Sequence, residues 1–209
     1  MMFHVAVLAA LASTLAACAA SPEPNTLTDA QKADGWILLF DGSSTEHFRG
    51  FRKDAIPEKG WVVEEGALKV QKGGGGGDLV TKATFDHFEF RCEWKVAEGA
   101  NSGIMYRVDE EGNYPWLSGP EMQILDDEHH PDGRSPLTSA GALYALIPSS
   151  TPNARPVGEW NSVRIVCKPD GTVEHWMNGA KIVEYQWGSD DIREKIAASK
   201  FSTMPRFMT

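Results

Sequence analysis

The fold of this 209-residue chain is indicated first by the stretch Gly119-Pro-Glu-Met-Gln-Ile-Leu-Asp-Asp-Glu-His-His-Pro-Asp-Gly133. Polar Glu121 and Gln123 alternate with apolar Met122 and Ile124, which indicates a strand with one buried and one polar face. The loop that follows is rich in carboxylates and imidazoles: Asp126, Asp127, Glu128, His129, His130 and Asp132. Such a strand end is typical of a functional site on a half-buried sheet. The alternative is a solvated edge strand followed by an acidic surface loop.

A second strand with the same alternation lies shortly upstream, in Asn101-Ser-Gly-Ile-Met-Tyr-Arg107. The pattern places Asn101 and Arg107 on one face and Ile104 and Tyr106 on the other. Two strands with their polar residues on the same side can line one groove. We therefore expect the polar residues of both stretches to face a common site.

Short strands separated by turn signals account for most of the remaining chain. Residues 85–96 alternate apolar with charged side chains, residues 61–70 read as a hairpin, and Asn178-Gly179 is a strong two-residue hairpin signal. Further strands are predicted at 35–42, 78–81, 142–147, 160–168, 172–177 and 180–185, and one short helix at 190–199. No repeat or linker divides them, so the pattern predicts one all-β domain, a β-sandwich of jelly-roll type.

Composition places the chain among ordinary globular proteins, with 42% hydrophobic and 23% charged residues. The formal net charge is -9 and the basic residues are scattered. A nucleic-acid surface needs a concentrated positive field, so no nucleic-acid partner is expected.

The N-terminus has the features of an export signal. Residues 1–17 are apolar but too short to span a bilayer stably, and small residues follow them. Leu15-Ala-Ala-Cys18 matches the bacterial lipobox pattern, which predicts a lipidated Cys18, a tether over residues 18–34 and a lipoprotein of the periplasm or cell envelope. Membrane contact would then occur only through the lipid anchor. The alternative is a cleaved signal that releases a soluble periplasmic product.

Three further residues have a structural prediction. Cys92 and Cys167 lie on the apolar sides of their strand patterns, and buried free thiols are the favoured state, although an oxidising compartment permits a disulfide. His175 precedes the Asn178-Gly179 turn and is predicted to pack or hydrogen-bond across strands.

Five motifs occur in an order that resembles one known family: 35–42 (Gly-Trp-Ile-Leu-Leu-Phe-Asp-Gly), 101–104 (Asn-Ser-Gly-Ile), 119–126 (Gly-Pro-Glu-Met-Gln-Ile-Leu-Asp), 158–161 (Gly-Glu-Trp-Asn) and 175–179 (His-Trp-Met-Asn-Gly). Together they resemble the 3-keto-disaccharide hydrolase family. The resemblance implies a concanavalin-like (lectin-like) jelly roll over residues 35–209 with a sugar-binding concave sheet. Family members continue with two more strands, Gly-His-Ile-Ala-Leu-Gln-Asp-His-Gly and Phe-Arg-Asn-Ile-Arg. On this basis we expect the domain to lack its last two strands.

The implied substrate, a 3-keto-glycoside, defines the groups that a site must supply. Its carbonyl acidifies the hydrogen on C2, and loss of that proton allows the glycosidic oxygen on C1 to leave, after which water adds. Such a site needs a base and a group that holds the enolate oxygen. Glu121 or His130 is the candidate base. Asn101, Arg107 or a bound Ca²⁺ or Mg²⁺ would hold the enolate oxygen, and Gln123 and Asp126 would position sugar hydroxyls or ligate that cation.

The expected function is therefore an exported enzyme that cleaves 3-keto-glycosides or 3-keto-disaccharides, as a hydrolase or an eliminating lyase. A carbohydrate-binding, lectin-like domain without turnover is the alternative from another class. Asp126 with Glu121 would instead suit an ordinary glycosidase acting on unmodified glycosides.

Overall fold

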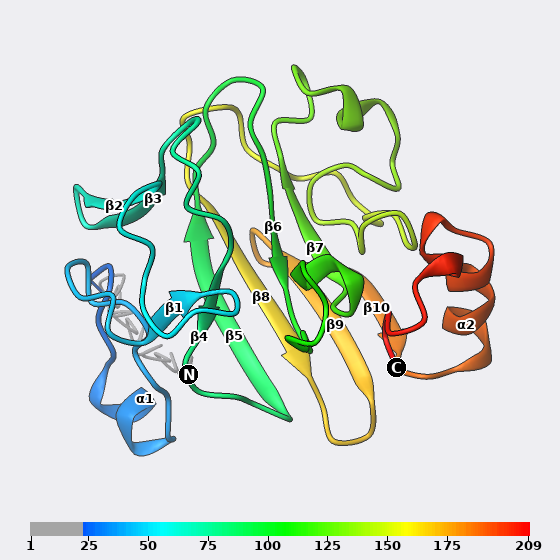
Figure 1. The fold of residues 1–209 in the computed structure, drawn as a ribbon, viewed down its shortest axis with the longest axis horizontal. Coiled ribbons are helices and arrows are strands. Elements are labelled where there is room, and N and C mark those ends of the chain that lie inside the picture. The colour runs from blue at the N-terminus through cyan, green and yellow to red at the C-terminus, as the bar shows by residue number, and fades with distance from the viewer. Residues whose placement is uncertain (1–22) are drawn as a thin grey trace, which may run out of the picture.

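The computed structural model describes residues 23–209, so the predicted signal peptide of residues 1–17 and the predicted lipidation site Cys18 lie outside the described residues. Strands dominate the described part of the chain (Figure 1), which confirms the all-β prediction. The elements are, in order, α1 (Asp29–Ala33), β1 (Phe48–Gly50), β2 (Trp61–Glu64), β3 (Ala67–Val70), β4 (Leu79–Thr81), β5 (Phe88–Trp94), β6 (Asn101–Met105), η1 (Pro115–Leu117), β7 (Glu121–Leu125), η2 (Pro131–Arg134), β8 (Asn161–Cys167), β9 (Thr172–Met177), β10 (Ala180–Gln186), α2 (Asp190–Ala197) and η3 (Lys200–Thr203).

The larger layer is a four-stranded antiparallel sheet in the order β10-β9-β8-β5. Alternate residues of each strand point into the core, as Val163, Ile165 and Cys167 do in β8. The β9–β10 hairpin turns at Asn178 and Gly179, whose φ angles of 48° and 83° suit the two left-handed positions of a type I′ turn. The predicted strands of this sheet and the Asn178-Gly179 turn are confirmed.

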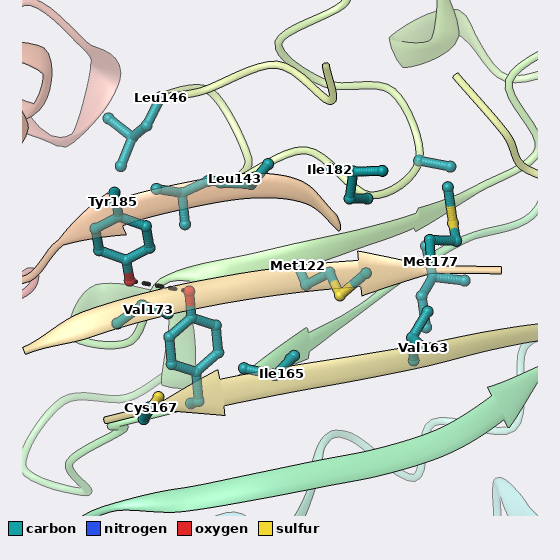
Figure 2. Packing of buried hydrophobic residues seen from close by; sticks show 14 of the residues in the cluster. Met122, Leu143, Leu146, Val163, Ile165, Cys167, Val173, Met177, Ile182 and Tyr185 are labelled. Atoms are coloured by element: carbon teal, nitrogen blue, oxygen red, sulfur yellow. Dashed lines mark hydrogen bonds between the residues drawn. The ribbon is translucent and has the colours of Figure 1, made fainter. Parts of the chain in front are cut away.

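The second layer is the antiparallel pair β6–β7, which packs its apolar face on the larger sheet. Figure 2 shows Met122 of β7 among Ile165, Val173 and Met177 of that sheet. Met122 is fully buried and Ile124 is 8% exposed. Because residues alternate along a strand, burial of this face turns Glu121 and Gln123 away from the core.

A buried hydrogen-bonded group connects the two layers. The Tyr106 hydroxyl lies 2.8 Å from Nε2 of His175 and 3.0 Å from the Tyr185 hydroxyl, the latter contact dashed in Figure 2. Nδ1 of His175 lies 3.3 Å from the Gly141 carbonyl oxygen. Burial lowers the pKa of His175 to about 4, so the ring is neutral at neutral pH. The prediction of a cross-strand hydrogen-bonding residue is confirmed.

The strand predicted at 142–147 is wrong. Leu143 forms bridges to Met122 and to Ile147, and the chain curls back on itself with Ala145 at a φ of 58°. This loop still covers the free edge of β7, because the Tyr144 N–H donates to the Glu121 carbonyl. The apolar run 142–147 therefore reflects burial against β7 and not strand geometry.

The strand predicted at 35–42 is also absent. Gly35 and Gly42 have φ angles of 82° and 91°, and Oδ1 of Asp41 accepts backbone hydrogen bonds from Ser43 and Ser44. Local side-chain bonds of this kind compete with a strand ladder. The segment instead places Trp36 against the Arg91 guanidinium, 4.6 Å from the ring centre.

Both described cysteines are free, as favoured above. Cys92 is paired with Val163 and Cys167 with Phe88 along the β5–β8 ladder, four positions apart, which is too far for a disulfide. Over residues 23–209, the structure contains no helix with the length and apolar character needed to cross a membrane.

Candidate functional site

A cavity of about 290 Å³ lies on the outward face of β6 and β7. It has two unlike walls. The polar wall consists of Asn101, Glu121, Gln123, Tyr144 and Lys200. The apolar wall consists of Trp116, Phe201, Met204 and Phe207. The strand ladder explains the polar wall, because Gly103 pairs with Gln123 and Asn101 with Leu125, so these side chains share one face.

The carboxylate of Glu121 is the ionisable group most altered by this environment. Burial raises its pKa to about 7, the Lys200 ammonium opposes that rise, and the carboxylates of Asp78 and Asp132 add to it. A carboxyl group that titrates near neutrality is suited to accept a proton from carbon at neutral pH. The predicted position of Glu121 in a groove agrees with the structure.

Asn101 and Tyr144 meet at the carboxylate of Asp132 beside the cavity. The Tyr144 hydroxyl donates to Oδ2 of Asp132 at 3.2 Å, and Nδ2 of Asn101 donates to the same oxygen at 3.3 Å. Burial, and next the charge of Asp132, raise the pKa of Tyr144, so the phenol keeps its proton at neutral pH. Nζ of Lys200 lies 4.2 Å from the centre of the Tyr144 ring. A phenol and an ammonium group are thus gathered near Glu121.

Gln123 is 1% exposed and lines the cavity. Its Nε2 donates to the Thr138 carbonyl at 3.2 Å, whereas its Oε1 has no partner among the described residues. A buried acceptor without a partner is costly unless something donates to it. Gln123 therefore has a free acceptor for a ligand hydroxyl, and its role in positioning a sugar stays a prediction.

Arg107 does not reach this cavity, contrary to the expectation that it shares the groove. Strand β6 ends at Met105, and Arg107 has a φ of 51°, which breaks the alternation that would have aligned it with Asn101. Its guanidinium stacks on Trp187 at 4.8 Å. Lys200 supplies the cationic group at the site instead.

Asp126 and His130 are also directed elsewhere. Oδ2 of Asp126 accepts from the Gly99 N–H at 2.7 Å and lies 2.8 Å from Nδ1 of His129, while Oδ1 accepts from the Glu128 N–H. The His130 ring caps η2 by accepting the Asp132 N–H at Nδ1. Both residues therefore shape the loop that holds Asp132, and neither lines the cavity.

The expected Ca²⁺ or Mg²⁺ ligands do not form one site. The oxygens of Asp126 are engaged within its own loop, and Gln123 lies in the cavity. Among residues 23–209 there is no group of three or more His, Cys, Asp or Glu side chains arranged to hold a metal ion. The residues described here do not fit a cation held by Gln123 and Asp126.

The apolar wall comes from two separate parts of the chain. Trp116 lies in η1, and Phe201, Met204 and Phe207 lie in or after η3. The Arg206 guanidinium, 2.8 Å from Asp109, and the Met208 N–H, 2.8 Å from the Ser118 carbonyl, hold the second part against the first. Sequence patterns missed this wall, and also Tyr144 and Lys200, because none of them lies on a strand or an α-helix long enough to show a repeating pattern.

Known proteins similar to this chain identify its family. A model of the 3-keto-alpha-glucoside-1,2-lyase-like domain matches residues 35–205. The chain belongs to this family. The match confirms the resemblance drawn from the order of the motifs.

Two further proteins are similar to this chain. The 3-keto-disaccharide hydrolase of Bacteroides thetaiotaomicron is 38% identical over an alignment of 190 residues, which covers 81% of this chain and 65% of that protein. The chain thus spans just under two thirds of the length of this curated relative. A crystal structure of a candidate glycosyl hydrolase from Parabacteroides distasonis has 34% identity and a TM-score of 0.79, covering 88% of this chain and 86% of that chain. This chain therefore shares the fold of that solved structure.

Proposed function

We propose that this chain cleaves 3-keto-glycosides, with Glu121 as the base that removes the proton from C2. One observation carries the proposal: the Glu121 carboxyl group lies in a cavity with amide, phenol and ammonium donors, and its pKa is raised to about 7. The family match and the 3-keto-disaccharide hydrolase relative support the substrate class.

The reaction follows from the chemistry of the ketone. Glu121 takes the C2 hydrogen as a proton, and the electron pair of the C–H bond forms an enolate across C2 and C3. The C3 carbonyl then re-forms, a double bond forms between C1 and C2, and the C1–O bond breaks with its electrons on the leaving oxygen. Water adds across the new double bond, placing hydroxyl on C1 and hydrogen on C2, and the proton held by Glu121 passes through solvent to the leaving oxygen, which restores the carboxylate. The net change is hydrolysis.

Lys200 and Tyr144 are the groups suited to hold the enolate oxygen. The ammonium group brings positive charge, and the phenol brings a donor that stays protonated at neutral pH. Placed donors of this kind stabilise the charge that develops in a transition state. Asn101 and Gln123 are left to bind sugar hydroxyls. This assignment replaces Arg107 in that role.

An ordinary glycosidase mechanism has less support, because it needs a second carboxyl group across the scissile bond from Glu121. Asp126, the expected partner, is turned into its own loop. Asp132 is a second carboxylate near Glu121, but it accepts hydrogen bonds from Tyr144 and Asn101. These contacts favour a role for Asp132 in orienting Tyr144 and Asn101.

The test compares a 3-keto-glucoside with its unoxidised parent by following release of the aglycone. Glu121→Gln keeps the size of the side chain and removes the base, so turnover should fall by at least about a hundredfold. Glu128→Gln, an exposed glutamate after the same strand, is the matched control and should keep its activity. Equal cleavage of both substrates would indicate an ordinary glycosidase, and sugar binding without cleavage would indicate a lectin-like domain.

We also propose that the protein is exported as a lipoprotein, on the basis of the apolar segment 1–17 and the sequence Leu15-Ala-Ala-Cys18. In a bacterial host it should fractionate with membranes, and Cys18→Ser should release it or leave it unprocessed. A wild-type protein found wholly in the cytosol would rule out export.

A further inference from the structure

The two walls of the cavity differ in what they can offer a ligand. Every side chain of the polar wall carries a hydrogen-bonding group. On the apolar wall only the indole N–H of Trp116 can form a hydrogen bond of ordinary strength, since Phe201, Met204 and Phe207 have none to offer beyond a thioether. For a glycoside whose sugar ring lies against Glu121, this second wall is the part of the cavity left to contact the rest of the molecule.

Trp116 presents a flat aromatic surface at the rim of the cavity. Its ring stacks on Tyr114 with centroids 4.8 Å apart and planes 9° apart. Both rings remain accessible, with Trp116 38% and Tyr114 53% exposed. Buried Pro115 lies between them and restricts the backbone. Exposed, stacked aromatic side chains held on a restricted turn form a ready surface for another ring.

The floor beside Trp116 is apolar and tightly packed. The rings of Phe201 and Phe207 stack with centroids 3.9 Å apart, and the two residues are 5% and 4% exposed. A group rich in hydroxyls would lose water here without gaining hydrogen bonds, which is unfavourable. An aromatic ring has no such loss. Tryptophan alone suits either a sugar or an aromatic ring, but this floor favours the aromatic ring.

We propose that the apolar wall is a subsite for an aromatic leaving group, so that the preferred substrates are 3-keto-glucosides of phenols. This inference rests on the proposed function for the identity of the sugar part. Trp116 is the specificity-determining residue, and its ring stacks on the aglycone.

The chemistry of the leaving group agrees with this assignment. When the C1–O bond breaks, the leaving oxygen takes the electron pair, and the apolar wall has no ionisable side chain to give it a proton. A phenol, with a pKa of about 10, leaves as the phenolate far more readily than an aliphatic sugar hydroxyl leaves as an alkoxide. An aromatic aglycone can therefore leave without an acid on the apolar wall to protonate its oxygen.

The experiment measures kcat and KM for the full chain with three substrates: the 3-keto derivatives of phenyl glucoside, of methyl glucoside and of a disaccharide. We expect the phenyl compound to have the highest kcat/KM. Trp116→Ala should lower kcat/KM for the phenyl compound by about tenfold, mainly through KM, and change the methyl compound little. Trp116→Phe should retain much of the preference.

Trp160→Ala is the matched control, since Trp160 is 41% exposed and packs against Lys95 at 4.9 Å, outside the cavity. It should leave all three substrates unchanged. Equal kcat/KM for the phenyl and disaccharide compounds, or an equal loss for all three in Trp116→Ala, would overturn the aromatic subsite while leaving the proposed reaction intact.

A binding measurement separates the two proposals if no substrate is cleaved. Calorimetry with unoxidised phenyl glucoside and methyl glucoside tests the subsite alone, using the wild-type chain and Trp116→Ala. Tighter binding of the phenyl compound that is lost in Trp116→Ala supports the subsite even where the proposed reaction fails. Equal binding of both compounds overturns the subsite.

Discussion

The carboxylate of Glu121 lies across the α-carbon of Gly103 on the neighbouring strand, and a β-carbon at residue 103 would overlap it. Glycine at this position of β6 therefore leaves the space in which the Glu121 carboxylate, the proposed base, lies against the sheet. The contact also limits where the carboxylate can move, because the strand backbone forms its floor. A fixed base is an advantage when a proton must be taken from one carbon of a sugar ring.

Gly103→Ala should displace the Glu121 carboxylate without removing it. Since a small misplacement of a reacting group can be costly, we expect turnover to fall by about ten- to a hundredfold. Circular dichroism should stay β-rich, which would show that the sheet persists. Ser102→Ala, at the exposed neighbouring position, is the control and should have wild-type activity. Wild-type turnover in Gly103→Ala would show that the position of this carboxylate does not matter.

The pH dependence of activity should follow the ionisation of Glu121. A base acts only when ionised, so kcat/KM should rise with pH and level off above about 7. The Lys200 charge lowers this pKa, and Lys200→Met should therefore move the midpoint to higher pH. Lys195→Met, which removes an ion pair with Asp191 on α2, should not move it. An unchanged midpoint in Lys200→Met would show that the charge of Lys200 does not influence the ionisation of Glu121.

Tyr144→Phe removes one hydroxyl and keeps the ring. If the phenol holds the enolate oxygen, kcat should fall by about a hundredfold while KM changes little, because the interaction forms in the transition state. A rise in KM with kcat retained would instead assign Tyr144 to ground-state binding. Steady-state kinetics with the phenyl substrate distinguishes the two results.

Stability should depend on pH through two groups with opposite signs. The folded pKa of His175, about 4, is depressed, so its contribution is present above the unfolded value of 6.5 and is lost as pH falls toward 4. This loss is on the order of a few kcal/mol. The folded pKa of Glu121, about 7, is raised from 4.5, so its contribution is present below 4.5 and is lost as pH rises through 7.

These contributions oppose each other between pH 4.5 and 6.5. Glu121→Gln removes the raised carboxyl, so its unfolding free energy should fall more steeply than that of the wild type on acidification through this window. Denaturant titrations at several pH values measure the two slopes. Equal slopes would contradict the raised pKa of Glu121.

Sequence patterns predicted the parts of the molecule that repeat regularly. The alternation at 121–125 correctly gave a strand with Glu121 and Gln123 away from the core, because burial of Met122 fixes the side on which its neighbours lie. Asn178-Gly179 gave the correct hairpin, because few residue pairs accept two left-handed positions.

The failures occur where a strand ends or a loop is held by distant contacts. Arg107 continues the alternating pattern in the sequence, but it lies beyond the end of β6 and has a positive φ. Its side chain therefore does not point to the same side as Asn101. Lys200 and Tyr144 reach the cavity from η3 and from the loop after β7, and no local pattern relates them to Glu121. Positions of this kind depend on tertiary packing.

The division of the cavity between a sheet and two turns has an evolutionary consequence. Glu121 is held by a strand ladder, where most substitutions would disturb the core, whereas Phe201, Met204 and Phe207 belong to a segment tied to its neighbours by Arg206 and a backbone bond to Ser118. Mutations in that segment can reshape one end of the cavity while the end that holds Glu121 stays in place. Descendants of one ancestral sheet can in this way diversify the compounds they process without reinventing their chemistry.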